Sequence, residues 1–328
     1  MLNLKSPWSP YLKEFYEYKQ LCGYKYNSSE SIINKFDEYY NSLNIKELKL
    51  TRDIIEPFLY LKEGIKITTQ KWKASVIRQF TIYVLKNNII DYAYIIPKIS
   101  SRGEDSFIPY IYSKNELIRI VEYISNYVSI DKPGTFSLNP NTINSVSTVF
   151  KTLISTGLRL NEALSLRVDD VDLENKLFII KEAKNNNERI VPFSTTLKDE
   201  ISKYISATPF KINHDDYLFQ FKCGKKVSSK MCGVYFRKTL KSIGMSKGPR
   251  IHDFRHTYAV MALTQLQHSE DNINLSLTYL SDYLGHKSLK ETQKYIWMTP
   301  DLFNDTKDKM NEYTSFIKTI YDGEKYYD

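Results

Sequence analysis

Four short segments in the second half of the chain carry arginine, lysine, histidine and tyrosine at spacings that could act on a phosphate group. The first is TGLRLNE, in which we expect one helix to end at Gly157 and the next to begin near Asn161. Arg159 then lies in a tight turn, with Glu162 close enough to orient its guanidinium group. A guanidinium held in this way can point into a cleft and bind an anion. A purely structural Arg–Glu pair is the alternative interpretation.

The second segment is EAKNNNERIVPF, which we expect to contain a turn between two strands. Lys184 in that turn carries a flexible ammonium group that could donate a proton to a leaving oxygen. Lys181, three residues earlier, is an alternative for the same role. A solvated turn lysine without a chemical role is the alternative interpretation of both.

The third segment is HDFRH, which opens a helix that continues as TYAVMAL. Residues three apart share one face of a helix, so His252 and Arg255 can act together on one ligand. An HxxR pair by itself also arises by chance, and its meaning therefore depends on the residues that accompany it.

The fourth segment is LGHKSLKETQKY, in which His286 precedes Tyr295 by nine residues. We expect Gly285 to end one helix, and Ser288 and Glu291 to form the capping box of the next. Tyr295 would then lie two turns into that helix. Its phenol could act as a nucleophile if positive charges nearby favour the ionised form. A tyrosine that only packs in the core is the alternative interpretation.

The order of these residues resembles that of the tyrosine recombinase, or phage integrase, family. TGLRLNE is similar to the first arginine box of the family, HDFRHT to its second, and LGHKSLKETQKY to its tyrosine box. The likeness is strong over about residues 110–300. The lysine segment departs from the pattern because many members have a glycine-flanked lysine there. Lys184 lies eight residues before Pro192, which favours it over Lys181.

The resemblance implies a catalytic set of six residues: Arg159, Lys184, His252, Arg255, His286 and Tyr295. In such a set the arginines bind the nonbridging oxygens of a DNA phosphate and the histidines donate hydrogen bonds or help with proton transfer. Tyr295 attacks to form a 3′-phosphotyrosyl link, and Lys184 protonates the 5′ leaving oxygen. We expect no cofactor and no metal, because the arginines neutralise charge and the link conserves the energy of the broken bond.

The remaining sequence predicts the elements that must hold these residues. The first hundred residues indicate helices that begin near Ser9, Ser29, Thr51 and Thr69. In the fourth of them, residues 69–86, Trp72 is expected on the apolar stripe and basic residues on the other faces. Residues 166–193 contain three β-prone runs that indicate a three-stranded antiparallel sheet, and the rest of the chain has helical periodicity.

We therefore expect a mainly α fold with a small antiparallel β-sheet, divided by a linker near KISSRGEDSFI. Residues 1–104 would form a four-helix, SAM-like core DNA-binding domain, and residues 105–112 the linker. Residues 113–328 would form the mixed α/β catalytic domain of a tyrosine recombinase, opened by a capping box at Ser113 and Glu116 and closed by a tail helix.

Composition favours a polyanionic partner: 46 Lys and Arg against 38 Asp and Glu give a net charge of +8 and a pI near 9.0. No apolar run approaches the ~20 residues that span a bilayer, and we expect a cytoplasmic protein without a membrane role. The three cysteines lack CxxC or CxxH partners, which indicates neither disulfides nor a zinc site. The expected DNA-phosphate contacts are Lys71, Lys73, Arg78, Lys222, Lys225, Lys226, Arg237, Lys238 and Lys241.

The resemblance also implies double-stranded DNA at specific recombination sites as the substrate, and a homotetramer on DNA joined through the C-terminal tail. The apolar stripe of that tail comprises Phe303, Met310, Tyr313, Ile317 and Ile320. About a hundred residues before the linker leave no room for an arm-binding domain, which favours a mobile-element enzyme for integration, excision or transposition. A resolvase or invertase, a type IB topoisomerase and an inactive DNA-binding regulator remain alternatives.

Overall fold

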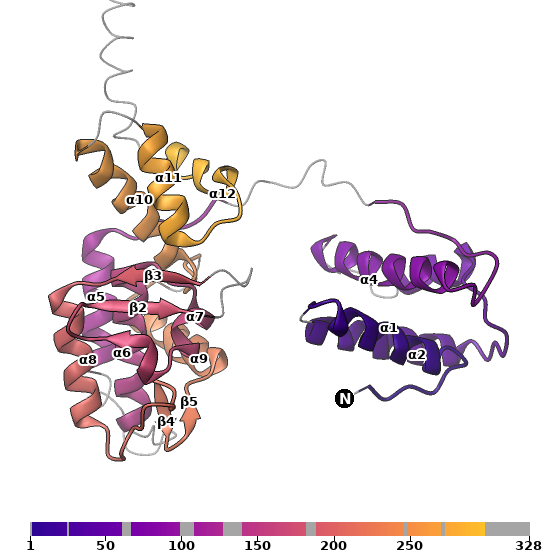
Figure 1. Ribbon diagram of the computed structural model, residues 1–328, viewed down its shortest axis with the longest axis horizontal. Helices are drawn as coiled ribbons and strands as arrows, with labels where there is room; N and C mark the ends of the chain where they lie inside the picture. The colour runs from indigo at the N-terminus through magenta and orange to yellow at the C-terminus, as the bar shows by residue number, and fades with distance from the viewer. Residues whose placement is uncertain are drawn as a thin grey trace, which may run out of the picture. The chain divides into compact units, whose positions relative to one another are not determined.

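The computed structural model describes residues 2–24, 26–60, 67–98, 108–126, 140–181, 188–245, 248–269 and 273–298. The chain divides into two compact units, Met1–Ser106 and Phe107–Asp328 (Figure 1). Helices dominate both units, and the second also contains a small antiparallel sheet. This confirms the predicted fold class. Within the described residues, no helix is long and apolar enough to cross a membrane.

The described part of the first unit contains α1 (Ser9–Leu21), α2 (Glu30–Ser42), α3 (Arg52–Tyr60) and α4 (Ile67–Lys86). Aromatic side chains fill the space between these helices. The indole of Trp8 meets the rings of Tyr40 and Phe80 edge to face, with centroids 6.1 and 5.4 Å apart. Such contacts add to the free energy gained from burying the rings. The four helices agree with those that the sequence predicts for this region.

One detail of α4 differs from the prediction. The side chain of Trp72 is 41% exposed, whereas Phe80 and Val84 are fully buried. Each residue advances about 100° around a helix, so Trp72 lies about 80° from Phe80 and about 120° from Val84. Trp72 therefore falls outside the buried stripe, and the prediction that it belongs to the core is wrong.

The second unit follows a longer order of elements. Its helices are α5 (Lys114–Ser125), α6 (Pro140–Thr156), α7 (Leu160–Ser165), α8 (Thr195–Ala207), α9 (Ser229–Ser242), α10 (Asp253–Ser269), α11 (Ile273–Leu284) and α12 (Leu289–Gln293). Its strands are β1 (Val171–Asp172), β2 (Leu177–Ile180), β3 (Arg189–Pro192), β4 (Gln220–Lys222) and β5 (Lys225–Lys226). The capping box at the start of α5 is confirmed, because Ser113 Oγ accepts from the Glu116 amide and the Glu116 carboxylate accepts from the Ser113 amide.

Strands β1, β2 and β3 form the predicted three-stranded antiparallel sheet, in that order. Phe178 of β2 lies opposite Val191 of β3, and both side chains are fully buried. The register places Arg189, the first residue of β3, opposite Ile180. A separate hairpin of β4 and β5, which the sequence did not predict as strands, turns at Gly224 with a φ of +67°.

Helix α6 runs through the core of the second unit and packs against α5, α8 and α10. Phe150 on α6 lies with its ring centroid 5.8 Å from that of Phe254 on α10. Phe254 also packs against Phe236 of α9 at 5.6 Å. Since Phe254 stands between His252 and Arg255 in the chain, this aromatic cluster fixes the first turn of α10 and with it the HxxR segment.

The segment around Tyr295 differs from the prediction. Ser288 precedes α12, but its side chain makes no capping hydrogen bond, and α12 ends at Gln293 after only five residues. The amide of Tyr295 donates to the carbonyl of Thr292 at 2.9 Å, an i→i−3 bond that tightens the chain. Tyr295 therefore lies at the junction of α12 and the 3-10 turn Ile296–Met298, not two turns into a helix.

Candidate active site

Five of the six residues implied by the sequence line one cavity of about 350 Å³. They come from the α6–α7 turn, the start of α10, the loop after α11 and the end of α12. The lining residues are Arg159, His252, Arg255, Gly285, His286, Lys287, Glu291, Lys294 and Tyr295. The sixth residue, Lys184, lies outside the described residues.

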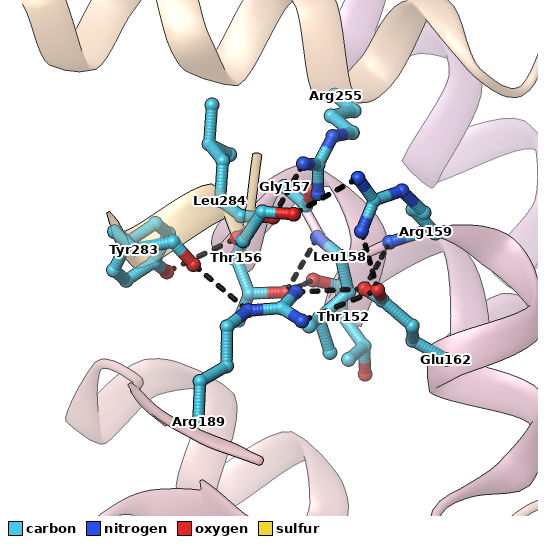
Figure 2. A network of polar contacts seen from close by, with 11 residues as sticks. Thr152, Thr156, Gly157, Leu158, Arg159, Glu162, Arg189, Arg255, Tyr283 and Leu284 are labelled. Atoms are coloured by element: carbon cyan, nitrogen blue, oxygen red, sulfur yellow. Dashed lines mark hydrogen bonds and ion pairs between the residues drawn. The ribbon is translucent and has the colours of Figure 1, made fainter. Parts of the chain in front are cut away.

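Glu162 holds Arg159 in place through the polar contacts that Figure 2 shows. The Glu162 carboxylate accepts from the amide of Arg159 at 3.0 Å and from its Nη1 at 2.7 Å. The same carboxylate accepts from Nη2 of Arg189 at 2.8 Å. Burial alone would raise the pKa of Glu162, but hydrogen bonds and charge from Arg189 and Arg159 lower it to about 2. Glu162 is therefore an ionised carboxylate shared by two guanidinium groups.

Arg189 has a place in the site that the sequence did not indicate. Its side chain is 10% exposed, and its Nε donates to the carbonyl of Tyr283 at 2.9 Å (Figure 2). A Cβ atom added to Gly285, which has a φ of +64°, would lie 3.0 Å from Nη1 of Arg189. Arg189 thus joins the sheet to the end of α11. It reads as an ordinary strand residue, and nothing in its local sequence pattern distinguishes it.

Arg255 is 2% exposed and connects two helix ends. Its Nη1 donates to the carbonyl of Gly157 at 2.9 Å, and its Nη2 donates to that of Leu284 at 2.6 Å (Figure 2). Burial and the charge of Arg159 lower the pKa of Arg255 to about 10. Arg255 still carries its charge at neutral pH, so two guanidinium groups face the cavity together with the ammonium groups of Lys287 and Lys294.

The pKa values of the two predicted histidines are both lowered, which favours the neutral form. Burial and then the charge of Arg255 lower the pKa of His252, and the same causes lower that of His286 to about 3. His286 Nδ1 shares a hydrogen bond with Thr292 Oγ1 at 2.8 Å. A neutral imidazole has one donor and one acceptor nitrogen. Each ring can therefore donate one hydrogen bond to a phosphate oxygen.

Tyr295 is 1% exposed, and its hydroxyl group shares a hydrogen bond of 3.0 Å with Nδ1 of His256. Its ring also stacks on that of His286, with centroids 6.2 Å apart. Burial raises the pKa of Tyr295, although the charges of Arg255 and Arg159 act to lower it. His256 was not among the predicted site residues. The signal that could have found it is its position directly after Arg255 in HDFRH.

Lys181 is directed elsewhere. Its Nζ forms an ion pair with Asp170 Oδ1 at 2.7 Å, and it lines a different cavity of about 200 Å³ together with Arg167 and Lys226. It is not among the residues that line the cavity of Arg159. Within the described residues, no group of three or more His, Cys, Asp or Glu side chains could hold a metal ion.

The basic residues expected to contact DNA fall into two kinds. Those on the β4–β5 hairpin and on α9 are exposed: Lys222, Lys225, Lys226, Arg237, Lys238 and Lys241. In the first unit, Lys71, Lys73 and Arg78 are only partly exposed. Arg78 donates to the carbonyls of Ile96 and Pro97, so its guanidinium supports the segment after α4.

The sequence matches the model of the phage integrase family over residues 115–300, a stretch that contains every residue lining the cavity. The chain belongs to this family. Its members are tyrosine recombinases, as the resemblance of the three boxes implied.

Relatives and solved structures agree with this membership. Tyrosine recombinase XerC of Rickettsia canadensis (strain McKiel) is 27% identical over 299 residues, which cover 89% of this chain and 91% of the relative. A Tn1549 transposon integrase in complex with a circular intermediate DNA has a TM-score of 0.62 and 16% identity, covering 87% of this chain and 94% of that one. XerH bound to a palindromic difH substrate has a TM-score of 0.60 and 21% identity, covering 89% and 79%. These structures share the fold of this phage integrase family member.

We predict that Glu162→Gln lowers the free energy of unfolding by about 3–5 kcal/mol at pH 7, because Arg189 loses its buried counter-ion. The pKa of Glu162 is about 2 in the folded chain against an ordinary value of 4.5. The ionised carboxylate therefore stabilises the fold above about pH 4.5, and this contribution is lost as the pH falls toward 2. Urea unfolding at several pH values measures this. The difference in the free energy of unfolding between wild type and variant should become smaller as the pH falls over that range.

The matched control is Glu200→Gln. Glu200 pairs with Lys151 at 2.5 Å, but their side chains are 28% and 22% exposed. Loss of a pair with this much exposure should cost about 1 kcal/mol or less. An equal loss of unfolding free energy in the two variants would contradict the prediction that the buried Glu162 stabilises the fold more than an exposed ion pair does.

Proposed function

We propose that this chain is a site-specific DNA recombinase that cleaves and rejoins strands through a 3′-phosphotyrosyl intermediate at Tyr295. The observation that carries the proposal is the cavity in which Arg159, Arg255 and Tyr295 meet. Two guanidinium groups anchored by a carboxylate and by helix-end carbonyls form a rigid receptor for one phosphate. Membership of the phage integrase family supports the same activity.

The reaction follows from the chemistry of the cavity. A phosphodiester occupies it with nonbridging oxygens toward Arg159 and Arg255, whose charges stabilise the additional negative charge of the pentacoordinate transition state. Tyr295 Oη forms a bond to phosphorus as the bond to the 5′ oxygen breaks. His252 and His286, both neutral, donate further hydrogen bonds. The reverse attack by a 5′-hydroxyl of another strand completes the exchange, without ATP and without a metal ion.

Double-stranded DNA at specific sites is the proposed partner. The exposed basic residues of the β4–β5 hairpin and α9 supply contacts to the phosphate backbone, which position the duplex without reading its sequence. We propose that Lys71 and Lys73 of α4, in the first unit, add further contacts to the phosphate backbone. Solved structures of XerH, lambda integrase and the Tn1549 integrase, all with DNA, share this fold.

We propose that the recombinase belongs to a mobile element and carries out its integration, excision or transposition. The curated relatives favour a second candidate, because the chain is 27% identical to proteins named XerC over most of its length. That candidate is a resolvase acting on sites of the host chromosome. A type IB topoisomerase would relax supercoils without exchanging strands between two sites, so exchange between two marked duplexes would exclude it.

We predict that the chain forms a covalent adduct with nicked attachment-site DNA and that Tyr295→Phe abolishes it, because the nucleophilic oxygen is removed. The measurement is denaturing electrophoresis of end-labelled DNA, with and without EDTA. Tyr279→Phe is the matched control, since Tyr279 is 52% exposed and does not line the cavity. Loss of the wild-type adduct in EDTA with recovery in magnesium would refute the metal-independent mechanism, and an adduct in Tyr295→Phe would refute the assignment of the nucleophile.

Lys184 is proposed as the general acid. A DNA substrate in which sulphur replaces the bridging 5′ oxygen tests this role. A thiol has a pKa of about 8.5, far below that of an alcohol, so a sulphur leaving group needs no proton donor. We predict that Lys184→Ala cleaves ordinary DNA about 10²- to 10⁴-fold more slowly but cleaves the sulphur-containing DNA at nearly the wild-type rate. Lys181→Ala should match wild type on both, because Lys181 pairs with Asp170. The opposite pattern would transfer the role to Lys181.

The tail after Met298 is proposed to link four protomers on two duplexes, although it lies outside the described residues. A recess of about 380 Å³ between α10 and α11 offers an apolar receptor for it, lined by Tyr258, Ala262, Gln265, Leu266, Tyr279, Leu280 and Tyr283. We predict that a chain ending at Met298 still forms the Tyr295 adduct on one site but no longer assembles two duplexes, as measured by native electrophoresis and sedimentation. Intact assembly by this shortened chain would contradict the proposal.

A further inference from the structure

Attack by Tyr295 requires an acceptor for the phenolic proton, and within the predicted set only the imidazole rings of His252 and His286 have a lone pair to offer when neutral. Nδ1 of His286 is engaged with Thr292 Oγ1 at 2.8 Å. Arginine and lysine, when charged, have no lone pair to offer. The hydroxyl of Tyr295 shares a hydrogen bond of 3.0 Å with Nδ1 of His256, which is not one of the six.

His256 is built firmly into this position. It lies in the first turn of α10, directly after Arg255, and its side chain is 5% exposed. The ring of His252 packs edge-on against it with centroids 4.8 Å apart, and the ring of Tyr295 lies 5.7 Å away. Because α10 is anchored by Phe254, the distance from His256 to Tyr295 depends on the packed core and not on a mobile surface chain.

The charges that face His256 keep its ring neutral before DNA binds. Burial, the neighbouring His252 and the cations Lys294, Arg250 and Arg255 lower the pKa of His256 to about 3. A neutral ring with hydrogen on Nε2 presents a lone pair at Nδ1, and the phenol then donates the hydrogen bond. The resting site therefore holds an acceptor already aligned with the proton that must leave.

We propose that His256 is the general base of the reaction: its Nδ1 accepts the phenolic proton as Tyr295 Oη bonds to phosphorus. The inference rests on the proposed function. The O–H bond of Tyr295 breaks and an N–H bond forms on His256, while the phosphorus–O5′ bond breaks and O5′ takes a proton from Lys184. In rejoining, His256 returns its proton to Tyr295 and Lys184 recovers its own from the attacking 5′-hydroxyl.

Arrival of DNA makes His256 a stronger base than it is in the free chain. The phosphate brings negative charge into the cavity that Arg255 and Lys294 line, and so offsets the repulsion those cations exert on an imidazolium. The transition state carries still more negative charge, which attracts the newly formed imidazolium. Proton acceptance is thereby coupled to phosphate binding, and unproductive ionisation of Tyr295 in the absence of DNA is disfavoured.

The test is the pH dependence of first-strand cleavage on nicked DNA in single turnovers between pH 6 and 9. With His256 as base, the wild-type rate is flat above about pH 6, because the acceptor is neutral throughout. His256→Asn and His256→Gln keep a polar group near Tyr295 but cannot take the proton. Both are expected to cleave about 10²- to 10⁴-fold more slowly at pH 7, with rates that rise tenfold per pH unit as the phenol ionises unaided. A residue that only held the ring in place would lower the rate without changing this slope.

Controls separate the possible failures. His214→Asn changes a histidine whose side chain is 90% exposed, and should leave rate and pH profile as in wild type. Thermal unfolding and DNA binding of the His256 variants report whether they fold. A wild-type rate that itself climbs tenfold per pH unit, or a flat profile in His256→Asn, overturns the general base and leaves the recombinase function standing. Absence of any Tyr295 adduct in wild type overturns the proposed function instead.

Discussion

The site depends on one buried carboxylate. Glu162 accepts hydrogen bonds from both Arg159 and Arg189, and those two arginines belong to a helix turn and to a strand. An isolated buried charge would be costly, and the cost falls only because two cations and a backbone amide surround it. The same arrangement fixes the direction of Arg159, whose guanidinium would otherwise sample many rotamers. The ion pair between Glu162 and Arg159 also orients the guanidinium group that we propose as an anion receptor, so the two interpretations of TGLRLNE are compatible.

Helix ends supply the second constraint. The last carbonyls of a helix have no partner within it and carry partial negative charge. Gly157 and Gly285 end α6 and α11 with φ of +62° and +64°, and the carbonyls at these ends accept from Arg255 and Arg159. Each arginine thus satisfies helix-end carbonyls and is oriented by them. Gly157 stands two residues before Arg159 and Gly285 directly before His286, so each glycine ends a helix next to a proposed site residue.

The sequence predicts those parts of the site that depend on local order. Gly157 and Gly285 mark helix ends, and the HxxR spacing places two side chains on one face, so their positions follow from short-range rules. Arg189 could not be predicted, because its partners Glu162 and Tyr283 are brought to it only by the packing of β3 against α11. The capping pattern before Tyr295 predicts that this residue lies in a helix. In the structure α12 ends at Gln293, and i→i−3 hydrogen bonds follow it. Patterns of residue type do not distinguish these two geometries.

Positive charge and burial have opposite effects on the ionisation of Tyr295. Arg159 and Arg255 favour the phenolate of Tyr295, yet burial favours the phenol and prevails in the free chain. The histidines around Tyr295 are neutral for the same reasons, burial and neighbouring cations. A bound phosphate would change both effects. It would offset the charge of the arginines, and it would make the neighbouring imidazole rings easier to protonate. In the free chain, then, more positive than negative side chains line the cavity, and burial keeps the phenol of Tyr295 protonated. In the proposed mechanism the phosphate of bound DNA supplies negative charge, so proton transfer from Tyr295 becomes favourable only when DNA is bound.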